Sequence, residues 1–340
     1  MEFSLLIRRL NYLRLIQKDL LFKNMKQTLS VIFFGTPKLA VPFLDRLNQE
    51  DSISIKAVIS QPDKPVGRKH IQIPSPIKQY AQNNNLPLLQ PKTLKSKNIF
   101  EEIKSIEAQM FIVVAYGNLL PKNILNLPHF GVVNVHPSLL PRHRGPSPIP
   151  FAIRLGDKQS GLSIMLLDEG MDTGPLLALK TIPISERETT TSFTEKIISL
   201  GPEFLLQTIK NYQDGLIKPI PQDNSKATQT YLLSRQDGRI NWSLAAQDID
   251  RQIRAMNPWP SSWTIWQKKG QPIRLKILEV KITSFASTKP AGSVFVKDDH
   301  LYVHTSDKAL EILTLQIEGK SCISSSQFIH GYGSYLDFFE

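Results

Sequence analysis

The residues best suited to chemistry lie in one stretch from Gly131 to Gly145, which reads GVVNVHPSLLPRHRG. Asn134 and His136 stand two residues apart in an apolar run typical of a buried strand, so both side chains point to the same face. An amide donor beside an imidazole can stabilise an oxyanion and move a proton. An Asn and a His at a strand end are more often structural groups with satisfied hydrogen bonds, and their spacing alone leaves both interpretations open.

A second polar cluster, DEGMDTG at residues 168–174, directly follows another apolar strand pattern. A carboxylate in this position could orient a histidine or stabilise its charge, as carboxylates do in hydrolase triads. Three acids with two glycines are equally compatible with a calcium-like loop or a solvated turn. The cluster lacks the period of an EF-hand and its closing glutamate, and the chain has a single cysteine. We therefore predict no metal site.

Short apolar strands that alternate with helices must position these two clusters. This alternation is typical of an α/β, doubly wound, Rossmann-like fold with a mostly parallel sheet. Such sheets bind ligands at the carboxyl edge of their strands, where Asn134 and His136 are expected. The predicted strands are 30–34, 55–60, 111–116, 132–135, 163–167 and 176–182, and the predicted helices are 40–47, 77–84 and 190–213.

The first strand-to-helix turn is unsuited to a nucleotide cofactor. It contains one glycine, Gly35, followed by Pro37, whereas a dinucleotide fold needs G-x-G-x-x-G to approach a pyrophosphate. The sequence also contains no Walker-type loop. We therefore predict that the protein uses no nucleotide cofactor.

The sequence divides into four parts. Residues 1–24 are rich in basic residues, and we interpret them as a start codon placed too far upstream, an organelle presequence or a basic helical arm. Residues 25–215 carry the α/β pattern. Residues 216–229 contain two prolines and no periodicity, which is typical of a linker. Residues 230–335 show short alternating strands that predict a small β-barrel or sandwich.

The composition excludes several classes of protein. Hydrophobic residues make up 41% of the 340 residues, enough for a packed core, and 41 basic against 30 acidic residues give a net charge of +11. This excess favours a polyanionic partner, although ordinary basic enzymes share it. No apolar run approaches the roughly 20 residues that span a bilayer. With one cysteine, the chain fits a reducing compartment, and we expect a cytoplasmic protein with no membrane partner.

The polar loop at residues 61–75 is too long and too basic for a passive connection. It contains QPDKPVGR, and its basic residues include Lys64, Arg68 and Lys69. Loops beyond roughly 12–15 residues without secondary structure of their own are usually functional or disordered. We predict a binding loop here, with a solvated flexible loop as the alternative.

Together these stretches resemble the folate-dependent formyltransferase family. The family pattern is Asn-x-His, then Ser-Leu-Leu-Pro, then a distant Asp, as in GVVNVHPSLLPRHRGPSPI and GLSIMLLDEGMDTGPLL. Three further stretches, VIFFGTP, QPDKPVGR and RINWSLAAQDIDRQIRAMNPWP, are similar to the branch that formylates methionyl-tRNA. The similarity runs from about Met25 to Gly319, and the motifs are specific in combination.

The resemblance implies a chemistry for three residues. The α-amine of initiator methionyl-tRNA would attack the formyl carbon of 10-formyltetrahydrofolate, giving formylmethionyl-tRNA for translation initiation. Asn134 would donate a hydrogen bond to the oxyanion, and His136 would stabilise it further and assist proton transfer. Asp172 would hold the imidazole in its productive tautomer and stabilise its charged form. No metal or nucleotide is needed, because the folate supplies the activated one-carbon unit.

The resemblance also implies binding residues and a partner. In the family the C-terminal domain is an OB-like barrel that supports the tRNA, so the same is expected of residues 230–335. Loop 61–75 would wedge against the acceptor stem, and a monomer is expected. The folate-binding loop corresponds to Ser138, Leu139, Leu140 and Pro141. The tRNA contacts correspond to Arg68, Lys69, Arg142 and Arg144.

Two positions depart from the family pattern. His143 stands where Trp or Tyr is common, and Pro137 stands where Gly is common. Neither touches the expected catalytic atoms, although His143 could alter the packing of the folate or of the acceptor end.

Two other functions are compatible with the sequence. A formyltransferase acting on an amino sugar nucleotide or another amine would keep Asn134, His136 and Asp172 but would not need the basic loop. A non-catalytic RNA-binding homologue would have no reason to keep all three residues. The expected location is the cytoplasm, or a mitochondrion or plastid if residues 1–24 are a presequence.

Overall fold

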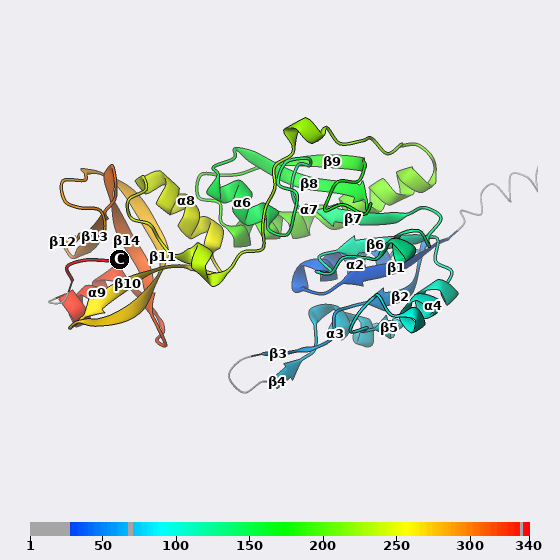
Figure 1. Ribbon diagram of the computed structural model, residues 1–340, viewed down its shortest axis with the longest axis horizontal. Helices are drawn as coiled ribbons and strands as arrows, with labels where there is room; N and C mark the ends of the chain where they lie inside the picture. Colours follow the sequence, from blue (N-terminus) through cyan, green and yellow to red (C-terminus); the bar gives the residue numbers. More distant parts are fainter. Residues whose placement is uncertain (1–27, 67–70, 334–335) are drawn as a thin grey trace, which may run out of the picture. The chain divides into compact units, whose positions relative to one another are not determined.

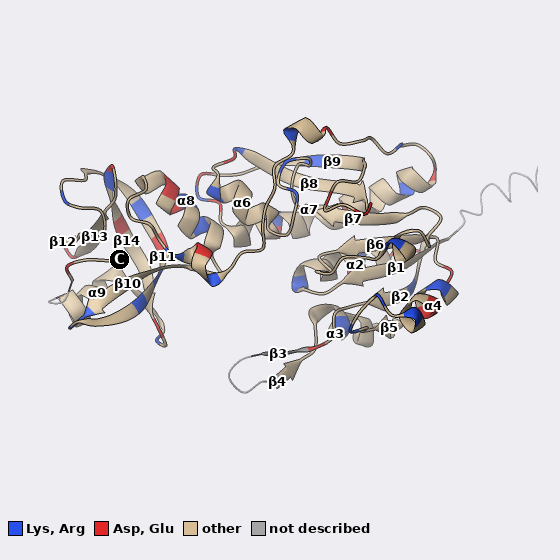
Figure 2. Cartoon of the chain, in the orientation of Figure 1, with Lys and Arg blue, Asp and Glu red and all other residues tan. Residues whose placement is uncertain are grey.

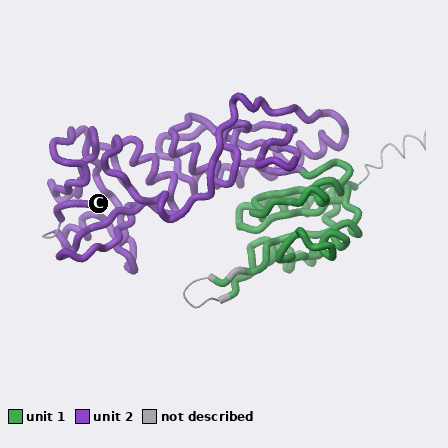
Figure 3. Tube along the Cα trace, viewed as in Figure 1, with its two compact units in different colours: residues 1–132 green, residues 133–340 purple. Residues whose placement is uncertain are grey.

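The computed structural model describes residues 28–66, 71–333 and 336–340. The chain forms two compact units, residues 1–132 and 133–340 (Figure 3). This division lies within the predicted α/β domain, and the basic segment 1–24 lies outside the described residues. Among the described helices, none is both long and apolar enough to cross a membrane.

Parallel strands form the sheet of the first unit, in the order β5-β2-β1-β6 (Figure 1). The central strand β1 is almost entirely buried, as its apolar sequence LSVIFFG predicts. Helix α2 packs by an apolar face made of Phe43, Leu44 and Leu47. The strands are β1 (Leu29–Gly35), β2 (Ile53–Ile59), β5 (Leu88–Leu89) and β6 (Met110–Val114), and the helices are η1 (Lys38–Ala40), α2 (Val41–Asn48), α3 (Pro76–Asn83), α4 (Lys97–Ser105) and α5 (Lys122–Leu125).

The segment 61–75 contains a β-hairpin, which corrects the prediction of a loop without secondary structure. Strand β3 (Lys64–Val66) pairs antiparallel with β4 (Ile71–Ile73). Strands of three residues are too short to show a periodic pattern, which is why the sequence gives no sign of them. At the base of the hairpin, the Asp63 carboxylate accepts hydrogen bonds from Lys78 Nζ at 2.6 Å and Gln90 Nε2 at 2.9 Å.

Antiparallel strands form the α/β part of the second unit, in the order β7-β8-β9. The predicted α/β fold class is confirmed, and these antiparallel pairs add to its parallel strands. The loop between β8 and β9 is too short for the crossover that a parallel pair requires. Helix α7 has the predicted bounds and is capped by Thr189, whose hydroxyl accepts from Ser192 N. The elements are β7 (Val132–His136), α6 (Pro148–Arg154), β8 (Gln159–Leu166), β9 (Leu176–Pro183) and α7 (Thr190–Gln213).

The C-terminal part is a curved antiparallel sheet with strand order β10-β11-β14-β13-β12, and β15 pairs with β14. The long strand β11 shifts register at several points, and such irregularities bend a sheet. Residues near the C-terminus pair with both edges of this sheet. Phe339 pairs with Trp266 of β10, and Phe338 pairs with Ser293, which directly precedes β12. The strands are β10 (Ser262–Lys268), β11 (Gln271–Ala286), β12 (Val294–Lys297), β13 (His300–His304), β14 (Lys308–Ile317) and β15 (Cys322–Ser324).

Helix α8 (Ala246–Met256) joins this sheet to the α/β part of the same unit. It packs against β11 on one side and against α6 and α7 on the other. Thr190 Oγ1 donates to the Ala255 carbonyl at 2.6 Å, and Arg254 Nη1 donates to the Glu188 carbonyl at 2.7 Å. The remaining elements are η2 (Asn224–Lys226), η3 (Arg235–Gly238) and α9 (Ser325–Tyr332).

Candidate active site

His136 ends strand β7 and is buried. Its Nε2 atom lies 2.9 Å from the backbone carbonyl oxygen of His143. A carbonyl can only accept, so Nε2 carries the proton and donates this hydrogen bond. In the neutral ring Nδ1 is then left with a lone pair, which makes it the nitrogen able to take up a proton.

Asp172 faces that nitrogen. Its Oδ2 atom lies 3.6 Å from His136 Nδ1, which is too long for a hydrogen bond but close enough for a strong charge interaction. The same oxygen accepts a hydrogen bond from Gly145 N at 2.8 Å. In this structure the neutral tautomer of His136 is thus fixed by the His143 carbonyl and not, as the resemblance implied, by Asp172. The Asp172 carboxylate is placed to stabilise the protonated ring.

The environment of His136 favours its neutral form. Burial lowers the pKa of His136 below its ordinary value, and the opposing effects of Asp172 and of the hydrogen bond to His143 do not cancel it. The ring is therefore neutral at neutral pH, ready to act as a base. Once protonated, it is stabilised by the adjacent carboxylate.

Asn134 precedes His136 on the same face of β7, opposite Met165 of β8. Its residue exposure is 9%, and its side-chain amide makes no hydrogen bond within the part of the chain that the structure describes. A buried amide without a partner costs free energy unless a ligand engages it. This unused donor is suited to an oxyanion, and the catalytic role of Asn134 stays a prediction.

The acidic cluster reaches His136 only because its loop folds back. Strand β8 pairs Ser163 with His136 but continues to Leu166, opposite Val133, before the loop begins. Within this loop, Asp168 Oδ1 accepts from Thr173 Oγ1 at 2.6 Å, as in a solvated turn. Nowhere in the described ranges do three or more His, Cys, Asp or Glu residues form a set that could hold a metal ion.

The predicted folate loop is held by its own hydrogen bonds. Ser138 is fully buried, and its hydroxyl donates to the Arg142 carbonyl at 2.7 Å. Ser163 Oγ donates to the Ser138 carbonyl and accepts from Leu140 N. Leu140 is also buried, whereas Leu139 and Pro141 are half-buried. Ser138 therefore shapes the loop, and its side chain is not available to a ligand in this arrangement.

The four basic residues predicted to contact tRNA have different environments. Arg68 and Lys69 lie outside the described residues. The Arg142 side chain is 47% exposed and forms a two-pronged hydrogen bond with Asp157. Arg144 is 4% exposed, and its guanidinium donates to side-chain oxygens of the segment 222–224. In this structure Arg144 is therefore paired within the chain, and its contact with a phosphate stays a prediction.

His143, one of the two departures from the family pattern, is buried beside Asp157. Its Nε2 atom lies 2.6 Å from Asp157 Oδ2. Burial of Asp157 raises its pKa, but hydrogen bonds from Arg142 and His143 outweigh this effect and hold the pKa below its usual value. Asp157 therefore stays ionised and fixes the ring of His143. The expectation that His143 does not touch the catalytic atoms is wrong for its backbone, because the His143 carbonyl bonds to His136 Nε2.

Sequence reasoning missed the backbone groups of this site and the segment that supports them. The His143 carbonyl and Gly145 N carry no side-chain signal. Gly145 has a φ of +104°, and a Cβ atom there would lie 2.6 Å from the Thr230 carbonyl oxygen, so only glycine fits. The polar segment 216–229, predicted as a linker, supplies Gln222 and Thr228 to the same loops.

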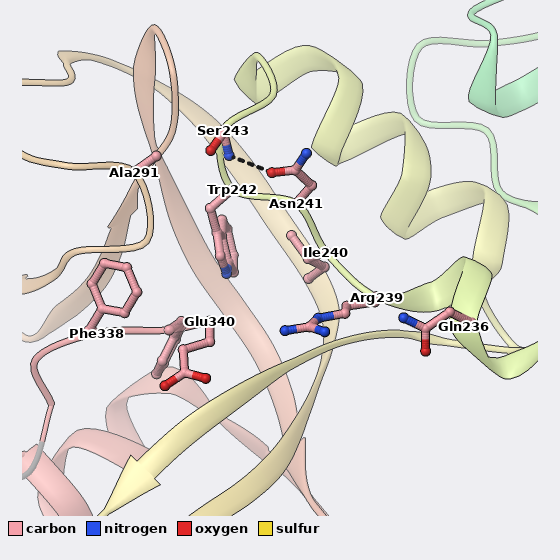
Figure 4. Close-up of a pocket in the computed structure, with 10 residues that line it drawn as sticks. Gln236, Arg239, Ile240, Asn241, Trp242, Ser243, Ala291, Phe338 and Glu340 are labelled. Atoms are coloured by element: carbon pink, nitrogen blue, oxygen red, sulfur yellow. Dashed lines mark hydrogen bonds between the residues drawn. The ribbon is translucent and has the colours of Figure 1, made fainter.

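A separate pocket of about 470 Å³ lies on the C-terminal sheet (Figure 4). Arg239, Trp242 and Glu340 are among the residues that line it, and Asn241 Oδ1 accepts a hydrogen bond from Ser243 N beside them. None of the predicted site residues lines this pocket. The pocket therefore does not coincide with the Asn134 and His136 site.

Solved structures with the same fold include proteins from Helicobacter canadensis and Aquifex aeolicus. An N-formyltransferase from Helicobacter canadensis, in complex with folinic acid and dTDP-3-aminofucose, superposes with a TM-score of 0.59 at 17% identity, covering 84% of this chain and 99% of that one. HypX from Aquifex aeolicus, in complex with tetrahydrofolic acid, gives a TM-score of 0.58 at 15% identity, covering 90% of this chain and 47% of that one. At these identities the likeness concerns the fold alone.

Sequence similarity is more specific. A family profile described as formyl transferase matches residues 28–209, and one described as formyl transferase, C-terminal domain, matches residues 232–333. The chain is 41% identical to the methionyl-tRNA formyltransferase of Pseudoalteromonas translucida, covering 92% of this chain and 97% of that protein. It is 38% identical to the methionyl-tRNA formyltransferase of Chloroflexus aurantiacus, covering 88% and 96%. A site with a neutral buried histidine, a facing carboxylate and a free amide thus stands in a chain that belongs to the formyl transferase family.

Proposed function

We propose that the protein transfers the formyl group of 10-formyltetrahydrofolate to the α-amine of initiator methionyl-tRNA. One observation carries the proposal. His136 Nδ1 makes no hydrogen bond within the described chain and lies 3.6 Å from the Asp172 carboxylate. The acceptor is supported by the relatives named methionyl-tRNA formyltransferase, which align over most of this chain.

His136 would act as the base of the reaction. The amine nitrogen forms a bond to the formyl carbon, and its surplus proton moves to His136 Nδ1. Burial keeps the pKa of His136 low enough for the ring to be neutral when the amine arrives. As the ring becomes positive, Asp172 stabilises it, and the proton is then available for the leaving nitrogen as the original C–N bond breaks.

Asn134 would stabilise the oxygen of the tetrahedral centre. The electron pair of the carbonyl moves onto that oxygen when the new C–N bond forms, and the negative charge needs a donor that is already in place. Asn134 offers an amide N–H on the same face as His136 with no competing partner in the described chain. Such fixed donors are worth about 3–4 kcal/mol in comparable sites.

The donor, 10-formyltetrahydrofolate, supplies an activated formyl carbon and needs no metal or nucleotide. The unpaired amide of Asn134 is the feature of the chain that fits a formyl oxygen. The loop Ser138, Leu139, Leu140 and Pro141 would bind the folate through backbone groups and through the half-buried Leu139 and Pro141, since the Ser138 hydroxyl is occupied.

Initiator tRNA would be held by basic residues. Figure 2 shows Lys and Arg spread over helices and strands of both units, in keeping with the net charge of +11. Arg142, exposed beside the site, is the described residue best placed to meet a phosphate. Arg68 and Lys69 remain predicted contacts, and we propose that the enzyme acts as a cytoplasmic monomer.

The test is single-turnover formyl transfer with the full chain, 10-formyltetrahydrofolate and radiolabelled methionyl initiator tRNA. We expect formylmethionyl-tRNA from the wild type and a rate lower by on the order of 10²–10⁴ for His136→Ala. His129→Ala, at an exposed histidine, is the matched control and should leave the rate unchanged. Arg68→Ala and Arg142→Ala should raise the KM for tRNA with little change in kcat.

Other acceptors are tested in the same assay. Formylation of an amino sugar nucleotide without formylation of methionyl-tRNA would overturn the acceptor and leave the chemistry intact. Binding of tRNA and folate without any product would instead identify a non-catalytic RNA-binding homologue.

A further inference from the structure

The segment 216–229 does not behave as a free linker. Ile220 pairs with Leu176 at the start of β9, and Gln229 pairs with Arg144 in the loop after β7. Between these two bridges, the half-buried side chain of Gln222 lies against both catalytic loops. This segment therefore holds together the two loops that carry Asp172 and the His143 carbonyl.

Gln222 uses both ends of its amide. Its Nε2 atom donates to the backbone carbonyls of Asp172 at 2.9 Å and Gly174 at 2.7 Å. Its Oε1 atom accepts from Arg144 Nε at 3.1 Å and Nη2 at 2.8 Å, and Arg144 Nη2 also donates to Asn224 Oδ1. The opposite requirements of two carbonyls and one guanidinium fix the orientation of this amide.

The backbone that Gln222 holds is in an uncommon conformation. Asp172 has a φ of +55°, in the left-handed region that non-glycine residues seldom adopt. Such a conformation persists only where surrounding contacts impose it. Within the described chain, the hydrogen bond that holds the Asp172 side chain comes from Gly145 N to Oδ2.

We propose that Gln222 is a positioning residue, which acts through Asp172 by holding its left-handed backbone so that the carboxylate faces His136. Arg144 orients the amide of Gln222, and this explains why a buried arginine stands beside the active site. The kinetic consequence of this inference rests on the proposed function. The position of Asp172 relative to His136 can be measured without any substrate.

The first experiment follows His136 itself in the full chain labelled with ¹⁵N-histidine. Its signal is identified by its loss in His136→Gln, and its titration is followed between about pH 5 and pH 8. The titratable groups that face His136 are Asp172 and His143, and His143 is paired with Asp157. We expect His136 to titrate at lower pH in Gln222→Met, because displacement of the carboxylate removes the charge that favours the protonated ring.

Two further variants separate this role from a general loss of structure. Gln222→Glu retains an oxygen acceptor for Arg144 but lacks the N–H donors to Asp172 and Gly174, so it should behave like Gln222→Met. Gln229→Met is the matched control in the same segment, because Gln229 is exposed and its pairing with Arg144 uses only the backbone. It should titrate and react as the wild type does.

The second experiment is a double-mutant cycle on the formyl-transfer rate. Gln222→Met should lower kcat about 10- to 100-fold with the KM values for both substrates unchanged, as expected for a misplaced catalytic group. In an Asp172→Asn background the same substitution should cost less than about twofold, because the interaction it supports is already lost.

The inference is overturned if Gln222→Met leaves the titration of His136 unchanged, or if its kinetic loss is the same in both backgrounds. It is also overturned if Gln222→Glu retains the wild-type rate. If the wild type formylates a different amine, the acceptor proposed above is wrong, while the titration of His136 still decides the role of Gln222.

Discussion

The α/β part of the second unit and the C-terminal sheet differ in where their charged side chains lie. Around His136, several charged and polar groups are buried and paired with one another, as Arg144 is with Gln222. In the C-terminal sheet the main core cluster is apolar, and cations lie on aromatic rings near the surface. There the Arg274 guanidinium is 4.4 Å from the Trp263 ring centre, and Lys268 Nζ is 4.6 Å from that of Tyr332.

This difference shows where sequence changes should affect chemistry and where they should affect stability. Buried polar networks depend on the geometry of every member, so single substitutions disturb function. An apolar core depends on volume and tolerates changes on its surface. The comparison therefore predicts that the two regions respond differently to substitutions of similar size.

The largest effect on stability is expected in the core of the C-terminal sheet. Phe339 is fully buried and its ring lies 6.3 Å from that of Trp242, so Phe339→Ala should lower the free energy of unfolding by about 3–5 kcal/mol. Urea denaturation measures this loss. Phe338→Ala is the matched control, since Phe338 is 41% exposed and should cost much less. Equal losses would contradict the proposed core position.

A comparable effect, on rate instead of stability, is expected at Asn134. Asn134→Ala should lower kcat about 10²–10³-fold, because the oxyanion loses its fixed donor. Asn134→Asp keeps the shape but removes the N–H donor, so it should be at least as slow. Single-turnover rates and urea midpoints measured together would show whether function falls while stability holds. A normal rate in Asn134→Asp would exclude a donor role.

A smaller effect is expected from the titration of His136. Its pKa is lower in the folded protein than in the unfolded chain, so the unfolded chain binds the proton more readily. The resulting contribution to stability is present above the ordinary histidine pKa of about 6.5 and is lost as the pH falls through the lowered value. Urea midpoints should therefore decline less below pH 6.5 in His136→Gln than in the wild type. Parallel curves for both proteins would refute this assignment.

The smallest effect is expected where a cation rests on a ring. Arg274→Ala should lower the free energy of unfolding by only about 0.5–1 kcal/mol, as expected for a cation–π contact of a half-buried side chain near the surface. Lys276→Ala, two residues along the same strand, serves as the control. Within the described chain the Lys276 side chain makes no contact with an aromatic ring. A loss above 2 kcal/mol at Arg274 would show that this surface is as tightly coupled as the active site.

Several elements could be predicted because their signals are local. Consecutive residues alone indicate the apolar strands β1 and β6 and the capped helix α7. The hairpin of β3 and β4 and the short helix α6 have no such signal, since a few residues cannot establish a period. The antiparallel pairing of β8 with β9 follows from the length of the loop between them and not from either strand.

The sequence by itself determined that Asn134 and His136 share a face, because alternation along a strand is a local property. It could not determine that Asp172 faces Nδ1, because that depends on a loop that folds back over β8. The roles of the His143 carbonyl and of Gln222 were likewise decided only by the tertiary structure. Backbone groups have no residue identity, and Gln222 lies 50 residues from the carbonyl it holds, so neither contact leaves a pattern along the chain.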